Sequence, residues 1–92
     1  MIKSFKHKGL EKFFKTGTTK GIQSDHVKRL RMQLAALDSA LNIGDIDIPG
    51  YRLHALKGSR KGLWSISVSG NWRITFELNE SNVYIVNYED YH

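Results

Sequence analysis

The spacing of the apolar residues changes near Tyr51, and this change constrains the fold more than any other feature of the sequence. Before it, Val27 and then leucines from Leu30 to Leu41 recur at intervals of three and four, which is typical of one face of an α-helix. After it, apolar and polar residues alternate in "LWSISVS" and "WRITFEL", which is typical of strands with one buried face. The chain is therefore expected to be α+β.

Capping and stop signals divide the first half. The segment "MIKSF" is interpreted as a short edge strand, and "HKGLEKFF" as a short helix that stops at Gly17. Ser24 is a good N-cap for the second helix. The leucine stripe of that helix is interpreted as core, because a chain this small needs most of its apolar faces inside.

Four strands are expected in the second half, at residues 51–56, 63–69, 72–78 and 83–91. The dipeptide "GN" and the run "NESN" join the last three by tight turns, which indicates an antiparallel meander. We thus expect a single domain over residues 1–92. Two N-terminal helices should pack on one face of a small, mainly antiparallel sheet, and the other face should form a shallow polar binding surface.

The composition excludes several classes of function. The chain has 92 residues and no cysteine, so disulfides, thiolate catalysis and cysteine-type zinc sites are excluded. No run approaches the roughly 20 apolar residues that a membrane span needs. The start of the chain is basic but lacks the apolar region of a secretion signal, so a cytoplasmic location is expected.

The net charge of +5 is unevenly distributed. Residues 51–75 hold five basic groups and no acidic group. A solvated surface usually mixes both signs, so this block favours a polyanionic partner, most simply nucleic acid. A soluble protein that merely has a high pI is the plainer alternative. The candidate contacts with RNA or the ribosome are Lys28, Arg29 and Arg31 on the second helix, and Arg60 and Lys61 in a glycine-flanked loop.

Polar residues of the second half suit the cleavage of RNA. Cleavage needs a base for the proton of the 2′-hydroxyl, an acid for the leaving 5′-oxygen and cations for the phosphoryl oxygens. Histidine titrates near neutrality and can serve either proton transfer, and an aromatic ring can stack a base. Arg73 alternates with Trp72 and Ile74 and should project away from the core. The candidates are His54, Lys57, Arg73, Asp90 and His92, with the ring of Tyr88 or Tyr91 beside them.

Plainer interpretations exist for these candidates. His54 taken alone is consistent with an ordinary surface histidine, and Arg73 could pair with Glu77 along the strand. A metal site made of His54, Asp90 and His92 is a third interpretation, although two histidines and one aspartate are a weak signature. The residues alone therefore indicate an RNA-binding domain and leave catalysis open.

The run "HALKGSRKGLWSISVSGNWRITF" and the final "NYEDYH" resemble the HigB-type toxins of bacterial type II toxin–antitoxin modules, within the RelE superfamily. The resemblance covers nearly the whole chain and implies a RelE-like fold. It implies a ribosome-dependent endoribonuclease that cuts messenger RNA in the A site without a metal or other cofactor. It also implies a HigA-like helix-turn-helix antitoxin, and a toxin–antitoxin complex that binds operator DNA. The alternative is an inactive homologue that binds RNA or the ribosome without cutting.

The resemblance also assigns roles by position. Better-known RelE members rely on lysines, arginines and a tyrosine and lack the histidine pair, so the acid and base assignments stay open. We expect His92 to be the general acid, alone or together with His54. Asp90 is expected to be the base or to orient an imidazole. Lys57 and Arg73 should stabilise the phosphorane, and Tyr91 should position the nucleotide.

Overall fold

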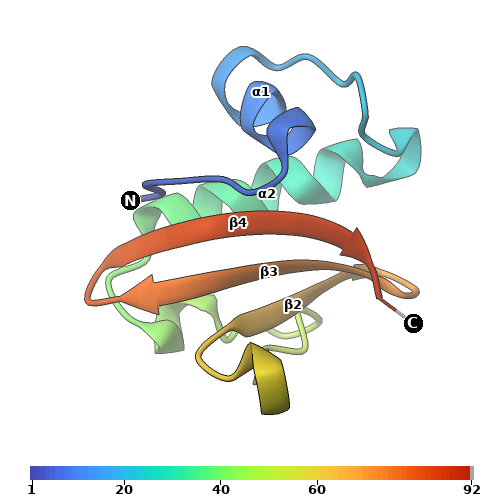
Figure 1. The fold of residues 1–92 in the computed structure, drawn as a ribbon. Helices are drawn as coiled ribbons and strands as arrows, with labels where there is room; N and C mark the ends of the chain where they lie inside the picture. Colours follow the sequence, from blue (N-terminus) through green and yellow to red (C-terminus); the bar gives the residue numbers. More distant parts are fainter. Residues whose placement is uncertain (92) are drawn as a thin grey trace.

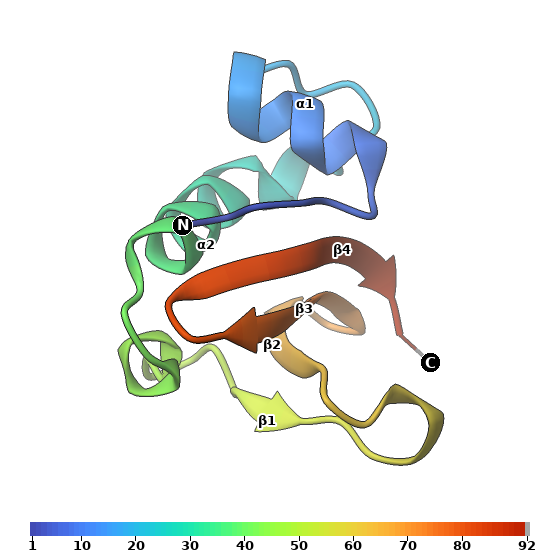
Figure 2. The same ribbon diagram turned by 60° about the vertical axis from the view of Figure 1, so that its left-hand side comes forward.

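The computed structural model describes residues 1–91 of the chain. Helices come first and a four-stranded antiparallel sheet follows, with the strand order β1-β2-β3-β4 (Figures 1 and 2). The predicted α+β class is confirmed. The elements are α1 (Lys8–Thr16), α2 (Val27–Ser39), β1 (His54–Ala55), β2 (Trp64–Ser69), β3 (Trp72–Asn79) and β4 (Asn82–Asp90), with 3-10 helices at Ser24–His26, Ile43–Ile46 and Gly58–Arg60.

The sheet is the predicted meander. A turn at Gly70 and Asn71 joins β2 to β3, and a turn at Glu80 and Ser81 joins β3 to β4. Gly70 has a φ of 55° and Glu80 has a φ of 57°, the left-handed conformation that the tightest hairpin turns require. Both predicted turns are therefore confirmed, and each strand lies beside the next one in the sequence.

The first strand is shorter than predicted. Residues 51–56 are expected to be extended, but only His54 and Ala55 pair with β2. Arg52 has a φ of 50°, which interrupts the extended backbone. Tyr51 is nevertheless buried, and its carbonyl oxygen accepts a hydrogen bond of 2.7 Å from the amide of Ser67. An irregular segment therefore replaces the first half of the predicted strand and still contributes a side chain to the core.

The N-terminal segment runs along the opposite edge of the sheet. Ile2 and Phe5 form isolated parallel bridges with Val83 and Val86 of β4, and Figures 1 and 2 show the segment beside that strand. The predicted edge strand is thus confirmed in its place, although it consists of two separate bridges. The amide of Lys6 donates to the carbonyl oxygen of Val86 at 2.9 Å, which brings this lysine next to β4.

The leucines of α2 face the core, as predicted. Leu30, Leu34 and Leu37 are each at most 1% exposed, and α2 runs along one side of the sheet in Figure 1. Leu41 is 73% exposed, so its predicted place in the stripe is wrong. The physical reason is that extended backbone at Ala40 ends the helix before it.

The predicted N-cap at Ser24 is also wrong. This residue begins the 3-10 helix that leads into α2. The 3-10 helix is preceded by Gln23 and α2 is preceded by His26, and neither side chain makes a capping hydrogen bond. Asp25 lies in the same 3-10 helix. The N-cap position of α2 is therefore His26, two residues after the position that the capping preference indicates.

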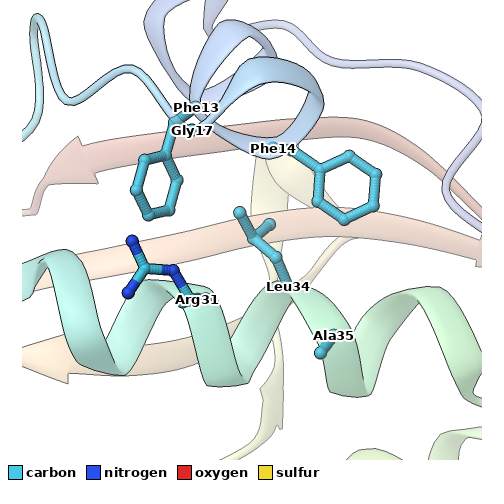
Figure 3. A pocket seen from close by; sticks show the side chains of 6 residues that line it. All are labelled: Phe13, Phe14, Gly17, Arg31, Leu34 and Ala35. Atoms are coloured by element: carbon cyan, nitrogen blue, oxygen red, sulfur yellow. The ribbon is translucent and has the colours of Figure 1, made fainter.

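Helix α1 packs on α2 and on the N-terminal segment. It ends at Gly17, as predicted, with a φ of 81°. It begins with a cap that the sequence does not predict, because the amide of Leu10 donates to Nδ1 of His7 at 2.9 Å. Figure 3 shows the contact region between the helices, a cavity of about 310 Å³ lined by Phe13, Phe14, Gly17, Arg31, Leu34 and Ala35.

A bulge in β4 changes which of its residues share a face. The register between β3 and β4 shifts between Thr75 and Glu77, and Ile85, in the bulge, has a φ of 48°. Val83 and Val86 are therefore both fully buried although they lie three positions apart. Strict alternation would have placed them on opposite faces of the sheet.

Candidate active site

The face of the sheet away from the core carries the candidate site. Trp72 and Ile74 pack with the core, so Arg73 between them projects from the opposite face, as predicted. The cross-strand neighbours of Arg73 are Ser67 on β2 and Glu89 on β4. A second row runs parallel to this one and consists of His54, Ser65, Thr75 and Asn87. We call this surface the polar face.

The centre of the polar face is covered. The sequence predicts a shallow open surface, but Ser65 is 0% exposed and Thr75 is 2% exposed. From the loop between β1 and β2, Arg60 reaches Glu89 on β4, which lies beyond β2 and β3 in the strand order. The prediction of an open surface is therefore wrong at its centre, because the loop folds over it.

Arg60 and Glu89 form a bidentate ion pair. Nη1 lies 2.7 Å from Oε1, and Nη2 lies 3.1 Å from Oε2. Asn87 donates from Nδ2 to Oε2 at 2.8 Å, so the carboxylate is held from two sides. The hydrogen bonds that Arg60 donates to Glu89 raise the pKa of the Arg60 guanidinium. A planar fork paired with a carboxylate in this way fixes the orientation of both groups.

Arg73 presents unsatisfied donors on the polar face. Its Nε and Nη1 are buried and have no hydrogen-bond partner among residues 1–91. The centre of the Tyr91 ring lies 5.4 Å from its guanidinium carbon and 6.0 Å from that of Arg60. Tyr91 is 42% exposed, and its amide donates to the carbonyl oxygen of Asn71 at 2.7 Å. Buried guanidinium donors beside an exposed ring suit a ligand with an anionic group and a planar base.

His54 and Lys57 lie on the β1 side of the polar face. The pairing of His54 with Ser65 places its imidazole on the face that carries Arg73. The imidazole is exposed, and its Nδ1 lies 3.2 Å from the carbonyl oxygen of Arg52. Lys57 is exposed and stands directly before the 3-10 helix Gly58–Arg60. Both side chains are accessible for proton transfer or for binding of an anion.

The remaining candidates lie at the end of β4. Asp90 pairs with Trp72, so the strand geometry directs it to the side of the sheet opposite Glu89. It is exposed at the last position of the strand. His92 lies outside the described residues. The predicted roles of Asp90 and His92 in proton transfer therefore stay predictions.

Beneath this end of β4 lies a cluster of rings that the sequence does not indicate, formed by the buried His26 and Tyr88 and the half-buried His7 and Trp72. The Tyr88 hydroxyl oxygen lies 2.6 Å from Nδ1 of His26 and accepts from the amide of Gln23 at 3.4 Å. The rings of Trp72 and Tyr88 are 4.6 Å apart between centres, and those of His7 and Tyr88 are 5.4 Å apart. Burial raises the pKa of Tyr88, so its hydroxyl stays protonated. The cluster fastens β4 to the segment before α2.

The basic residues predicted to contact RNA fall into two groups. Arg29 is half-buried and donates hydrogen bonds of 2.8 and 3.2 Å to two backbone carbonyl oxygens. Arg60 is engaged with Glu89. Lys28, Arg31 and Lys61 are exposed. The exposed residues Lys28, Arg31 and Lys61 are therefore more accessible to a polyanion than the engaged Arg29 and Arg60.

Three residues of the site are not predicted from the sequence. Lys6, Asn87 and Glu89 line a polar cavity of about 320 Å³ together with Arg60 and Lys61. Asn87 and Glu89 alternate with Tyr88 and share a face with Tyr91, which is a weak signal that sequence reasoning could have used. For Lys6 there is no such signal, because only the parallel bridges bring it beside β4.

Within the described part of the chain, no group of three or more histidine, aspartate or glutamate side chains is arranged to hold a metal ion. The metal site considered from the sequence includes His92, which lies outside that part. Residues 1–91 also contain no helix that is long and apolar enough to cross a bilayer.

Known proteins resemble the chain in sequence and in fold. Residues 3–92 match the family described as RelE-like toxin of type II toxin-antitoxin system HigB. Endoribonuclease HigB of Proteus vulgaris is 52% identical over 92 residues, which is all of both chains. The crystal structure of YafQ from E. coli covers 98% of this chain and 91% of its own, with a TM-score of 0.58 and 18% identity.

The solution structure of the conserved hypothetical protein HP0894 from Helicobacter pylori covers 97% of this chain and 96% of its own, with a TM-score of 0.51 and 15% identity. At these identities the two structures show a shared fold alone. The family match over residues 3–92 and the full-length relative decide membership. The chain belongs to the HigB family of RelE-like toxins of type II toxin–antitoxin systems.

Proposed function

We propose that the protein is an endoribonuclease that cuts messenger RNA in the A site of the ribosome and thereby arrests translation and growth. The observation that carries this proposal is Arg73, whose buried guanidinium donors lie beside the exposed ring of Tyr91. Each RNA nucleotide offers a phosphate for the first group and a base for the second. The 52% identity to Endoribonuclease HigB supports the same class of reaction.

The proposed reaction is an in-line attack within the RNA. The 2′-oxygen forms a bond to the adjacent phosphorus while the bond from phosphorus to the 5′-oxygen breaks. One fragment then ends in a 2′,3′-cyclic phosphate and the other begins with a 5′-hydroxyl. A base takes the proton of the 2′-hydroxyl, and an acid supplies a proton to the 5′-oxygen. This route requires no metal ion.

The side chains divide this work by their chemistry. Lys57 and Arg73 stabilise negative charge on the phosphoryl oxygens, and Tyr91 positions the nucleotide. His92 is assigned as the acid, alone or with a second histidine. The groups proposed to carry protons are His54, Asp90 and His92.

Binding to the ribosome is assigned to exposed cations that have no proposed part in the chemical step. Lys28 and Arg31 lie on α2, and Lys61 lies in the loop that covers the polar face. Neutralising them should weaken association with ribosomes and reduce its salt dependence, by roughly one unit of slope for each phosphate that the variant no longer binds. Arg29 is a weaker candidate, because its hydrogen bonds to backbone carbonyl oxygens already engage it.

Membership of a type II toxin family implies an antitoxin partner. We propose that this partner is a HigA-like protein with a helix-turn-helix fold, which neutralises the toxin and binds operator DNA together with it. Because the proposed target of the toxin is the translating ribosome, we expect the toxin to act in the cytoplasm. Purification of the toxin with the product of the neighbouring gene tests the partner.

Single-turnover cleavage on ribosomes programmed with a defined messenger RNA tests the function. We expect a cut within the A-site codon, a 5′-hydroxyl on the downstream fragment and no cut in the free RNA. Chelation should leave the chemical step intact as long as the ribosomes keep the magnesium that they need. Binding without cleavage would favour the non-catalytic ribosome-binding alternative. Loss of cleavage that trace zinc or manganese restores would contradict a metal-independent reaction.

A further inference from the structure

We propose that Arg60 is a positioning residue, and that its ion pair with Glu89 holds the loop of residues 57–62 across the polar face in the geometry that cleavage requires. The proposal rests on the proposed function, because it assigns Arg60 a part in that reaction in place of a contact with the ribosome.

The ion pair joins two distant parts of the site. Arg60 belongs to the loop between β1 and β2, and Glu89 belongs to β4 at the other side of the sheet. Two hydrogen bonds of 2.7 and 3.1 Å connect them, and their side chains are 33% and 23% exposed. By contrast, Lys15 and Glu11 on α1 share one bond of 2.8 Å and are 62% and 37% exposed. The first pair is better shielded and fixed in orientation.

One end of the ion pair is anchored in regular structure. Glu89 lies within β4, pairs with Arg73 across the ladder, and accepts a further hydrogen bond from Asn87. The other end belongs to a short backbone turn, in which the amide of Leu63 donates to the carbonyl oxygen of Arg60 at 3.1 Å. The loop is therefore fastened to the sheet through a side chain as well as through its two ends.

The ion pair sets the position of two proposed catalytic side chains. The guanidinium of Arg60 lies 6.0 Å from the centre of the Tyr91 ring, on which Arg73 also packs. The amide of Arg60 donates to the carbonyl oxygen of Lys57 at 3.4 Å, so the backbone of Lys57 belongs to the same loop turn. Displacement of catalytic groups by about 1 Å can slow a reaction about a hundredfold.

A role in binding the ribosome fits these contacts less well. Both terminal nitrogens of Arg60 already donate to a carboxylate, which also cancels the charge that would attract a phosphate. A phosphate would have to displace Glu89 and leave that carboxylate partly buried without its partner. The next residue, Lys61, is exposed and is better suited to bind RNA.

The test compares Arg60→Gln, Glu89→Gln and the double variant on programmed ribosomes. Each single variant should slow single-turnover cleavage about ten- to a hundredfold. The toxin concentration that half-saturates the ribosomes should change by less than about threefold, with an unchanged salt slope. The double variant should be no slower than the slower single variant, because both substitutions remove one interaction. The control is Glu11→Gln, which removes the exposed ion pair on α1 and should leave the rate unchanged.

A ribosome contact predicts a different pattern. Arg60→Gln would then weaken binding and reduce the salt slope by about one, whereas Glu89→Gln would free the arginine and leave binding equal or stronger. That pattern would overturn the proposal, and so would parental cleavage rates in both single variants.

If the parent protein does not cleave RNA, the proposed function is rejected, but the role of the ion pair is still open to test. Hydrogen exchange tests whether the ion pair holds the loop without relying on cleavage. In folded Glu89→Gln, the loop amides of Lys61 and Leu63, which donate to backbone carbonyl oxygens, should exchange about tenfold faster than in the parent. Thermal unfolding of the same samples confirms that the variant is folded. Exchange at the parental rate would show that the ion pair does not hold the loop and would overturn the proposal.

Discussion

Tyr88 and Glu89 are neighbours on β4, yet their side chains meet opposite surroundings. Tyr88 is 3% exposed, contacts Trp72 and shares a hydrogen bond with His26. Glu89 lies on the polar face and forms its ion pair with Arg60. One side of the strand is therefore buried and closely packed, whereas the other holds charged groups beside a cavity.

The two sides of β4 show how one strand can contribute both to the stability of the fold and to a reactive site. Burial of apolar side chains on the core side supplies most of the folding free energy. The polar face holds charged groups in place. Among residues 1–91 it leaves Nε and Nη1 of Arg73 without a hydrogen-bond partner, which costs stability but prepares a site for an anion. Substitutions on the core side should change the free energy of unfolding, and substitutions on the polar face should change cleavage.

The largest effect on cleavage is expected for His92→Ala. A positioned acid or base contributes about 10²–10⁴-fold, so single-turnover cleavage should fall by about that factor. The free energy of unfolding is expected to change by less than about 0.5 kcal/mol if the imidazole serves the reaction and not the stability of the fold. Cleavage within about threefold of the parent would remove His92 from the catalytic set and pass the acid role to His54 or Tyr91.

The largest effect on stability is expected for Phe76→Ala on the core side of β3. Phe76 is 0% exposed, and truncation of such a side chain costs about 3–5 kcal/mol. Denaturant unfolding measures this loss directly. The fraction that remains folded should cleave at a rate similar to the parent. If the cleavage rate per folded molecule of Phe76→Ala falls as far as in the polar-face variants, the core side and the polar face do not differ in function as proposed.

A smaller effect on stability is expected for Tyr88→Phe. The substitution keeps the ring against Trp72 but removes the hydroxyl that pairs with His26, which leaves a buried nitrogen without its partner. The cost should be about 1–3 kcal/mol in the free energy of unfolding. An unchanged unfolding midpoint would show that this hydrogen bond does not fasten β4 to the segment before α2.

The smallest effect is a pH dependence of stability at the start of α1. Burial lowers the pKa of His7 below its usual 6.5 by more than a backbone hydrogen bond raises it. The unfolded chain therefore binds more protons, so this contribution is fully present above about pH 6.5 and is lost as the pH falls below that value. Protonation also removes the acceptor for the amide of Leu10, a cap that contributes about 1 kcal/mol.

The variant His7→Asn tests this dependence, because asparagine can cap the helix without titrating in this range. Stability curves of parent and variant should converge at pH 8 and diverge between pH 6.5 and 5, with the parent losing more. Parallel curves over that range would show that His7 does not contribute to the pH dependence.

Local patterns account for what could be predicted from the sequence. The alternation in β2 and β3 indicates the meander and the outward direction of Arg73, because side chains of a strand point to alternate faces. The interval of the leucines indicates the buried face of α2 up to Leu37, and Gly17 marks the end of α1. These signals depend on residues a few positions apart.

Features that depend on distant residues could not be predicted. The ion pair between Arg60 and Glu89 joins residues 29 positions apart and covers the polar face. The hydrogen bond between His26 and Tyr88 spans 62 positions. The bulge at Ile85 changes the alternation of β4 at a residue type that rarely adopts a positive φ. No local pattern indicates any of the three, because each requires the folded chain.

The substitution Arg73→Met tests the central claim, that the polar face carries the chemistry and the core side carries the stability. Methionine keeps much of the length of the side chain but removes the guanidinium, including the buried donors that have no partner in the described range. Single-turnover cleavage should fall by about 10²–10³-fold, as for the removal of other donors to a charged transition state. In the same samples, the free energy of unfolding should stay constant or rise by about 1–3 kcal/mol, because the unsatisfied donors are removed. Parental cleavage, or a fall in cleavage that a loss of folded protein explains, would contradict the claim.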